Sequence, residues 1–212
     1  MSTLTAIRSR LASVPVIGII RGCPPENLVA VAEAAVEGGV AVIEVTLDSP
    51  NALDGIARLV ARGDEAFIGA GTVRTRQETS DAVSAGARFV VSPIVSTDVI
   101  DEARRQGVDT IPGAATPTEI WLAVTAGAAA VKVFPVATLG GAEYLKAVSA
   151  PLGHPPLLAT GGVDVSNARA LLEAGAFAIG VGGSIFSSEA MSAGDTHAVK
   201  RAAEDIVSEV RR

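Results

Sequence analysis

Lys132 is a charged residue within an apolar stretch of the sequence. It is one of three lysines among 212 residues, and it lies within the apolar run Ala128–Pro135, which reads AAAVKVFP. A run rich in valine and phenylalanine predicts a strand buried on both faces, as the strands of parallel sheets are. A buried ammonium group is costly unless it is paired or loses its proton. A buried, neutral amine is the form that nucleophiles and Schiff-base formers use, although a strand-end lysine that reaches water would show the same pattern.

Glu44 is the candidate partner of Lys132. Side chains alternate between the faces of a strand, so Glu44 shares a face with Val42 and Thr46, and Lys132 shares a face with Phe134. If both faces point into a barrel, the carboxylate and the amine meet above its core. An amine that attacks a ketone needs protons moved on and off oxygen and carbon. A carboxylate within reach can move them, which raises the reaction rate by about 10²–10⁴-fold. A structural ion pair is the alternative interpretation.

Two glycine pairs near the C-terminus suggest an anion site. Gly161-Gly162 and Gly182-Gly183-Ser184 each follow a strand-like run. Loops after the seventh and eighth strands of α/β barrels bind phosphate through bare backbone N–H groups, usually beside a helix N-terminus, here expected at Asp164. Tight turns alone would also use these glycines, and Ser184 could be a plain helix cap.

The elements that would position these residues alternate along the whole chain. Strand-like runs occupy 16–20, 40–45, 67–70, 88–91, 109–111, 130–134, 157–160 and 177–181. Helical patterns lie between them, and four helices end in a glycine that leads into the next strand. Thr75 with Glu78 and Thr116 with Glu119 form expected capping boxes, and Ser49-Pro50 an expected helix start.

Eight strands alternating with eight helices predict a single (β/α)8 TIM barrel over residues 1–212. A further helix at 2–12 is expected to cover the bottom of the barrel. An open, doubly wound sheet is the alternative. In a barrel, Arg21 would follow strand one and Thr72 would follow strand three, both at the C-terminal mouth where function is found.

Composition narrows the classes of function. The net charge is −6 and there is no cluster of basic residues, which argues against a nucleic-acid partner. A single cysteine, Cys23, allows no intrachain disulfide and favours the cytoplasm. The N-terminus lacks a signal-peptide pattern, and no uncharged run reaches the roughly 20 residues of a membrane span. His154 and His197 are the only histidines, and neither lies near an expected strand end on the active face, which argues against a barrel enzyme that holds its metal ion through histidines.

Seven motifs in order resemble one known family. They are Glu44-Val45-Thr46-Leu47, Gly69-Ala70-Gly71-Thr72-Val73, Ser92-Pro93, Ile111-Pro112-Gly113, Val131-Lys132-Val133-Phe134-Pro135, Thr160-Gly161-Gly162-Val163 and Gly182-Gly183-Ser184. The chain resembles the class I 2-keto-3-deoxy-6-phosphogluconate and 4-hydroxy-2-oxoglutarate aldolases from about Val14 to its end.

The resemblance implies a metal-independent, cytoplasmic homotrimer without a cofactor. It would cleave a 2-keto-3-deoxy-6-phospho sugar acid to pyruvate and glyceraldehyde 3-phosphate, or act on 4-hydroxy-2-oxoglutarate. By resemblance, Lys132 is the Schiff-base lysine and Glu44 the general acid/base. The implied substrate-binding residues are Thr72 for the carboxylate, Pro93 and Phe134 for the pocket wall, and Gly161, Gly162, Gly183 and Ser184 for phosphate.

One position departs from the gluconate-type pattern. Those members carry an arginine directly after the Glu-Val-Thr-Leu motif, and Asp48 stands there in this chain, as a short polar residue does in the 2-dehydro-3-deoxy-6-phosphogalactonate branch. We therefore expect Arg21 and Thr72 to flank the substrate carboxylate, with Asp48 turned outward. A sugar-phosphate isomerase or epimerase on the same barrel, or a non-enzymatic binder, would not need Lys132 and Glu44 together.

Overall fold

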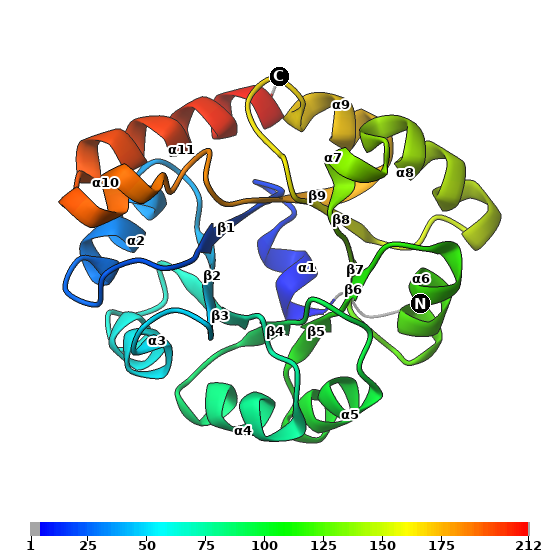
Figure 1. Ribbon diagram of the computed structural model, residues 1–212, viewed down its shortest axis with the longest axis horizontal. Helices are drawn as coiled ribbons and strands as arrows, with labels where there is room; N and C mark the ends of the chain where they lie inside the picture. The colour runs from blue at the N-terminus through cyan, green and yellow to red at the C-terminus, as the bar shows by residue number, and fades with distance from the viewer. Residues whose placement is uncertain (1–4, 212) are drawn as a thin grey trace.

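The computed structural model describes residues 5–211, and its parallel strands form a ring surrounded by helices (Figure 1). The strands are β1 (Val16–Ile20), β2 (Val42–Thr46), β3 (Phe67–Gly71), β4 (Phe89–Val91), β5 (Asp109–Ile111), β6 (Gly113–Ala114), β7 (Val131–Val133), β8 (Leu157–Thr160) and β9 (Ala176–Val181). Their order in the sheet is β5-β4-β3-β2-β1-β9-β8-β7-β6.

The fifth strand of the barrel is divided in two at Pro112. Its first half, β5, pairs with β4, and its second half, β6, pairs with β7. The two halves are consecutive in the chain, so the ring is closed, and the expected eight-stranded TIM barrel is confirmed. Each expected strand lies within two residues of the observed one.

The helices lie outside the ring, except α1 (Figure 1). They are α1 (Ala6–Arg10), α2 (Leu28–Glu37), α3 (Ala52–Val60), α4 (Arg76–Ser84), α5 (Thr97–Gln106), α6 (Pro117–Thr125), α7 (Val136–Leu139), α8 (Gly141–Ser149), α9 (Ala168–Glu173), α10 (Ser188–Ala193) and α11 (Thr196–Val210), with a short 3-10 helix at Ala150–Leu152. None of the helices between residues 5 and 211 is long and apolar enough to cross a membrane.

Helix α1 covers one end of the barrel. Ile7 and Leu11 are buried with the inward side chains of the strands, and the Ile7 N–H donates to the Asp109 carboxylate at 2.9 Å. The expected helix at 2–12 is thus present as Ala6–Arg10, and its first residues lie outside the described part of the chain. Closing this end leaves the opposite, C-terminal end for a site.

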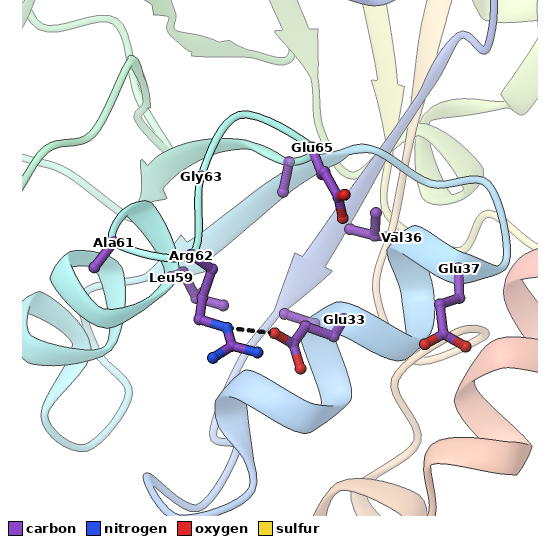
Figure 2. Close-up of a pocket in the computed structure, with 10 residues that line it drawn as sticks. Glu33, Val36, Glu37, Leu59, Ala61, Arg62, Gly63 and Glu65 are labelled. Carbon is purple, nitrogen blue, oxygen red and sulfur yellow. Dashed lines mark hydrogen bonds and ion pairs between the residues drawn. The ribbon is translucent and has the colours of Figure 1, made fainter.

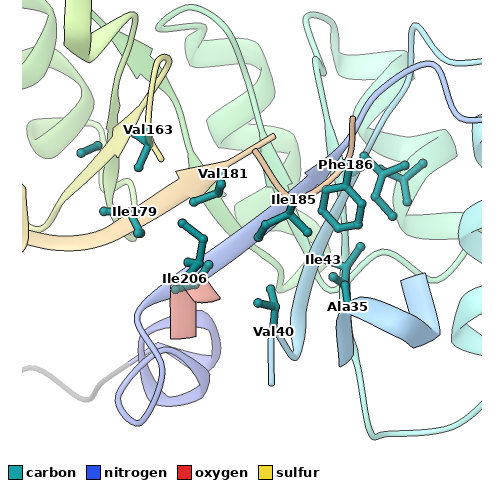
Figure 3. Packing of buried hydrophobic residues seen from close by; sticks show 14 of the residues in the cluster. Ala35, Val40, Ile43, Val163, Ile179, Val181, Ile185, Phe186 and Ile206 are labelled. Carbon is teal, nitrogen blue, oxygen red and sulfur yellow. The ribbon is translucent and has the colours of Figure 1, made fainter. Parts of the chain in front are cut away.

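The larger part of the core lies between the strands and the outer helices. Figure 3 shows this layer around Ile43, Ile179, Val181 and Phe186, all buried. Valine, isoleucine and alanine dominate it, which suits the close packing of helices on a parallel sheet. Burial on both sides explains why the strands are continuously apolar in the sequence.

The local signals were confirmed in part. Gly39, Gly86, Gly127 and Gly175 end their helices with positive φ, as expected of glycine C-caps. Thr116 and Glu119 form a reciprocal capping box. Two expected helix starts were wrong. Helix α3 begins at Ala52, because the Ser49 hydroxyl is engaged by the neighbouring loop, and α9 begins at Ala168, after a turn at Asp164.

Candidate active site

Lys132 and Glu44 lie together at the C-terminal end of the barrel. Lys132 is on β7 and Glu44 on β2, and Lys132 Nζ is 3.9 Å from Glu44 Oε1. Both are buried, with side-chain exposures of 8% and 0%. Neither carboxylate oxygen of Glu44 has a hydrogen-bond donor among the described residues. A buried carboxylate without donors contributes little to stability, so its place suggests proton transfer with a bound molecule.

Gly71 on β3 makes room for the Glu44 carboxylate. A Cβ at Gly71 would lie 2.6 Å from Glu44 Cγ and closer still to the carboxylate, so no larger residue fits without moving Glu44. On the other side of the pair, the Phe134 ring centroid is 5.4 Å from Lys132 Nζ. Phe134 remains 41% exposed, so it forms a wall of the mouth and does not seal it.

A cavity of about 360 Å³ opens above Lys132. Seven of the expected site residues line it, namely Arg21, Lys132, Phe134, Gly161, Gly162, Gly183 and Ser184. These seven residues are spread over more than 160 positions of the chain, whereas Glu44, Thr72 and Pro93 are not among the residues that line the cavity. The size suits a small organic ligand.

Arg21 connects this cavity to Thr72 and Asp48. Arg21 Nη2 donates to Thr72 Oγ1 at 2.9 Å, and Nη1 donates to Asp48 Oδ2 in an ion pair. Thr72 has a φ of 59°, which is rare for a β-branched residue and is often kept for a function. Arg21 and Thr72 are adjacent, as expected. Asp48 is exposed and is not among the residues that line the cavity, in line with the expectation that it turns outward, but its ion pair with Arg21 was not predicted.

The two glycine loops lie side by side at the cavity. Gly161 and Gly162 have φ of 94° and 76°, and a Cβ at Gly162 would lie 2.6 Å from the Ala137 Cβ. The Ser184 hydroxyl donates to the Val163 carbonyl at 2.9 Å and so ties the loop after β9 to the loop after β8. Ser184 therefore does not cap a helix. The two loops bring backbone groups close together at the cavity, and the N–H groups of such loops can bind an anion.

The positions of Pro93 and Thr160 differ from what the sequence indicated. Pro93 follows β4 and is half-buried against Gly113, but it is not among the residues that line the cavity. Thr160 does line it, and its buried hydroxyl has no hydrogen-bond partner among residues 5–211. No role was assigned to Thr160 from the sequence. Its position at the end of β8, on the same face as the inward Leu158, was the signal that could have found it.

Cys23 is not a competing nucleophile. Burial, followed by the charge of Glu26, raises the pKa of the Cys23 thiol to about 11, so the thiol stays protonated at neutral pH. No group of three or more His, Cys, Asp or Glu side chains in the described part of the chain is placed to hold a metal ion.

A second cavity, larger than the one at Lys132, lies elsewhere. It has about 850 Å³ and lies outside the barrel, between α2 and the segment 61–66 (Figure 2). Glu33 pairs with Arg62 across it at 2.6 Å, and Glu65 projects toward Val36. This groove contains neither a buried nucleophile nor a glycine loop, so we assign the chemistry to the smaller cavity at Lys132.

A buried amine and carboxylate at the catalytic end of a closed barrel define the class of protein, an α/β-barrel enzyme that works on a small anionic substrate. Comparison with known proteins narrows this class. Residues 7–202 match the family model described as KDPG and KHG aldolase. The chain is 33% identical over 204 residues to the KHG/KDPG aldolase of Escherichia coli K12, covering 96% of this chain and 95% of that protein.

Two further relatives agree. The 2-dehydro-3-deoxy-6-phosphogalactonate aldolase of Escherichia coli K12 is 35% identical over 174 residues, which are 81% of this chain and 84% of that protein. The structure of KDPG aldolase from Legionella pneumophila, with pyruvate captured as a covalent carbinolamine, has a TM-score of 0.87 and 30% identity, covering 96% of this chain and 98% of that one. The chain belongs to the KDPG/KHG aldolase family of carbon–carbon lyases, and the isomerase or epimerase alternative is set aside.

Proposed function

We propose that this chain is a class I aldolase that reversibly cleaves a 2-keto-3-deoxy-6-phospho sugar acid to pyruvate and glyceraldehyde 3-phosphate, with Lys132 as the Schiff-base residue. The observation that carries the proposal is the buried pair at the barrel mouth, in which Glu44 has no hydrogen-bond donor and lies 3.9 Å from the amine. Family membership supports the reaction class.

We propose that two side chains carry out the steps. Lys132 Nζ attacks the C2 ketone of the substrate to form a carbinolamine, which loses water to give an iminium. The electrons of the C3–C4 bond then move into the iminium as the C4 hydroxyl loses its proton to Glu44, directly or through one water, and the aldehyde leaves. Glu44 returns the proton to C3 of the enamine, and water releases pyruvate from Lys132. We propose Glu44 for these proton transfers because its carboxylate lies close to the amine of Lys132.

Substrate binding follows from the charges around the cavity. Arg21 and Thr72 are proposed to hold the keto-acid carboxylate, because a guanidinium and a hydroxyl are strong donors to an anion. The loops with Gly161, Gly162, Gly183 and Ser184 are proposed to hold the phosphate at the other end of the cavity. Phe134 forms the wall beside the amine, and Pro93 is proposed to contribute from the β4 side.

Asp48 favours the galactonate-type substrate as a second candidate within the same reaction. Gluconate-type members have an arginine at this position, and the galactonate branch has a short polar residue. The test compares the rates at which the two C4 epimers are cleaved at equal concentration, with pyruvate release as the measured signal. A higher kcat/KM for the gluconate epimer contradicts the galactonate assignment.

A metal-free, cytoplasmic homotrimer is also part of the proposal. The amine and the carboxylate supply all the proton and electron movements of the reaction, so we expect activity to survive treatment with EDTA. Ile94, Trp121 and Leu122 are between 51% and 54% exposed, and such apolar side chains suit burial between subunits. Light scattering at micromolar concentration tests the trimer, and a monomer mass would contradict it.

The central test is borohydride reduction in the presence of pyruvate, followed by peptide mass mapping. We expect one modification per chain, at Lys132. Lys146 and Lys200 are matched internal controls, because both are surface lysines paired with Glu143 and Glu37. Their side chains are 58% and 41% exposed, outside the cavity, so they should stay unmodified. Modification that persists in Lys132→Ala would disprove the assignment.

A further inference from the structure

We propose that Asp48 is an intramolecular competitor of the substrate. Its carboxylate occupies the guanidinium of Arg21, and it must leave that contact when the carboxylate of a keto acid binds there. This inference rests on the proposed function, because it requires that Arg21 receives the substrate carboxylate.

The contacts of Arg21 are the first evidence. One terminal nitrogen donates to Asp48 and the other donates to Thr72 Oγ1 at 2.9 Å. Arg21 lines the cavity that holds Lys132, and Asp48 does not. A carboxylate binds a guanidinium best through two parallel hydrogen bonds. A keto acid in that position would have to share these donors with Asp48, and two carboxylates at one guanidinium repel each other.

The contact is weak enough to be exchanged. The side chains of Arg21 and Asp48 are 52% and 40% exposed, and ion pairs with this exposure contribute little because water screens them. A second cation is near. The charge of Asp48 adds to the raised pKa of Arg74, whose main cause is Glu78, so the guanidinium of Arg74 lies within electrostatic range of Asp48 while it is paired with Glu78. The ion pair between Arg21 and Asp48 therefore reduces the apparent affinity for the keto acid by a modest factor.

Ser49 keeps the backbone in place while Asp48 moves. The Ser49 hydroxyl accepts from the Gly22 N–H at 2.8 Å and lies 3.0 Å from Thr46 Oγ1. These bonds join the loop after β1 to the loop after β2 without using Asp48. A substitution of Asp48 thus removes the competing charge and leaves the two loops tied.

The same exchange would assist release of pyruvate. When the product carboxylate begins to leave Arg21, Asp48 can take its place, so the guanidinium is never without an anion. The device acts only on ligands that carry a carboxylate. A ketone without one, such as pyruvamide, would bind without displacing Asp48.

The experiment measures the rate of borohydride inactivation against pyruvate concentration. Asp48→Asn should lower the half-saturating concentration by roughly 1.5- to 5-fold, with no such change for pyruvamide. Asp54→Asn is the matched control, because it removes the same charge from the neighbouring helix, where Asp54 is 70% exposed and pairs with Arg58. It should leave the half-saturating concentration unchanged.

The double variant separates competition from general repulsion. In an Arg21→Ala background, Asp48→Asn should have no effect, because there is no guanidinium left to contest. An improvement that persists without Arg21 would show a simple charge effect and overturn the inference. So would an unchanged or higher half-saturating concentration in Asp48→Asn. Failure to trap Lys132 in the unmodified chain at any pyruvate concentration would instead overturn the proposed function.

Discussion

Replacing Gly71 by alanine should lower the rate of aldol cleavage by about 10²-fold while Lys132 stays able to form a Schiff base. Gly71 lies on β3 opposite the Glu44 side chain, and an added Cβ would be 2.6 Å from Glu44 Cγ, where ordinary contacts begin at 3.4 Å. The side chain must therefore retreat by roughly 1 Å, and a misplacement of about 1 Å can cost about 10²-fold in rate. Lys132 is on the other side of the barrel mouth and does not contact Gly71, so Schiff-base formation should persist.

Gly69→Ala is the matched control for this variant. Gly69 is on the same strand and the same face, two residues deeper, and its added Cβ would lie 2.5 Å from ring atoms of Phe89 instead of touching Glu44. Both variants overpack the barrel and should lose about 1–3 kcal/mol of stability. Only Gly71→Ala should lose kcat for aldol cleavage, by about 10²-fold.

The assay couples pyruvate release to a reductase, and urea unfolding gives the stability of each variant. If Gly71→Ala keeps the turnover of the unmodified chain, or if Gly69→Ala loses as much activity at equal stability, then the position of Glu44 does not limit the reaction. The role of Glu44 as the acid/base would then have to be abandoned.

Three further outcomes are expected. Glu44→Gln should lower kcat by about 10²–10⁴ in the same coupled assay, and wild-type turnover would move the acid/base role to another group. Thr160→Val removes a buried hydroxyl without a partner, so urea unfolding should show equal or higher stability, by up to about 1 kcal/mol, and a clear loss would reveal a hidden hydrogen bond. The hydrogen bond from Arg105, with one from Gln106, lowers the pKa of buried Glu102 to about 2. Its contribution is therefore present above pH about 4.5 and lost toward pH 2, so the stability gap between wild type and Glu102→Gln should close over this range. A gap that stays constant would contradict the shift.

The barrel and the pairing of Lys132 with Glu44 were predictable because both depend on short-range periodicity. Alternation along each strand placed Glu44 and Lys132 on inward faces, and the topology of the barrel then brought the two faces together. The glycine helix ends were predictable for a similar reason, since a positive φ is a local requirement.

The parts that failed depend on how side chains meet across loops. Ser49 was expected to cap a helix, but its hydroxyl binds the Gly22 N–H, which is 27 residues away in the chain. Asp48 was expected to turn outward because an inward carboxylate would repel the substrate; it stays outside the cavity lining, but its ion pair with Arg21 was not predicted. Local pattern cannot choose between a cap and a contact with another loop when both satisfy the same polar group.

The division of the fifth strand at Pro112 has a consequence for the motions of the barrel. At this position β5 pairs with one neighbour and the two-residue β6 pairs with the other, so no single segment of the fifth strand pairs on both sides. Proline has no N–H to add to either. The hydrogen-bond ladder of the barrel is thus weakest at this seam, the break at Pro112 between β5 and β6. Amide hydrogen exchange should be fastest there among the barrel strands. Lys132 donates its own backbone N–H to the Pro112 carbonyl, so opening of the seam would reach the strand that carries the amine.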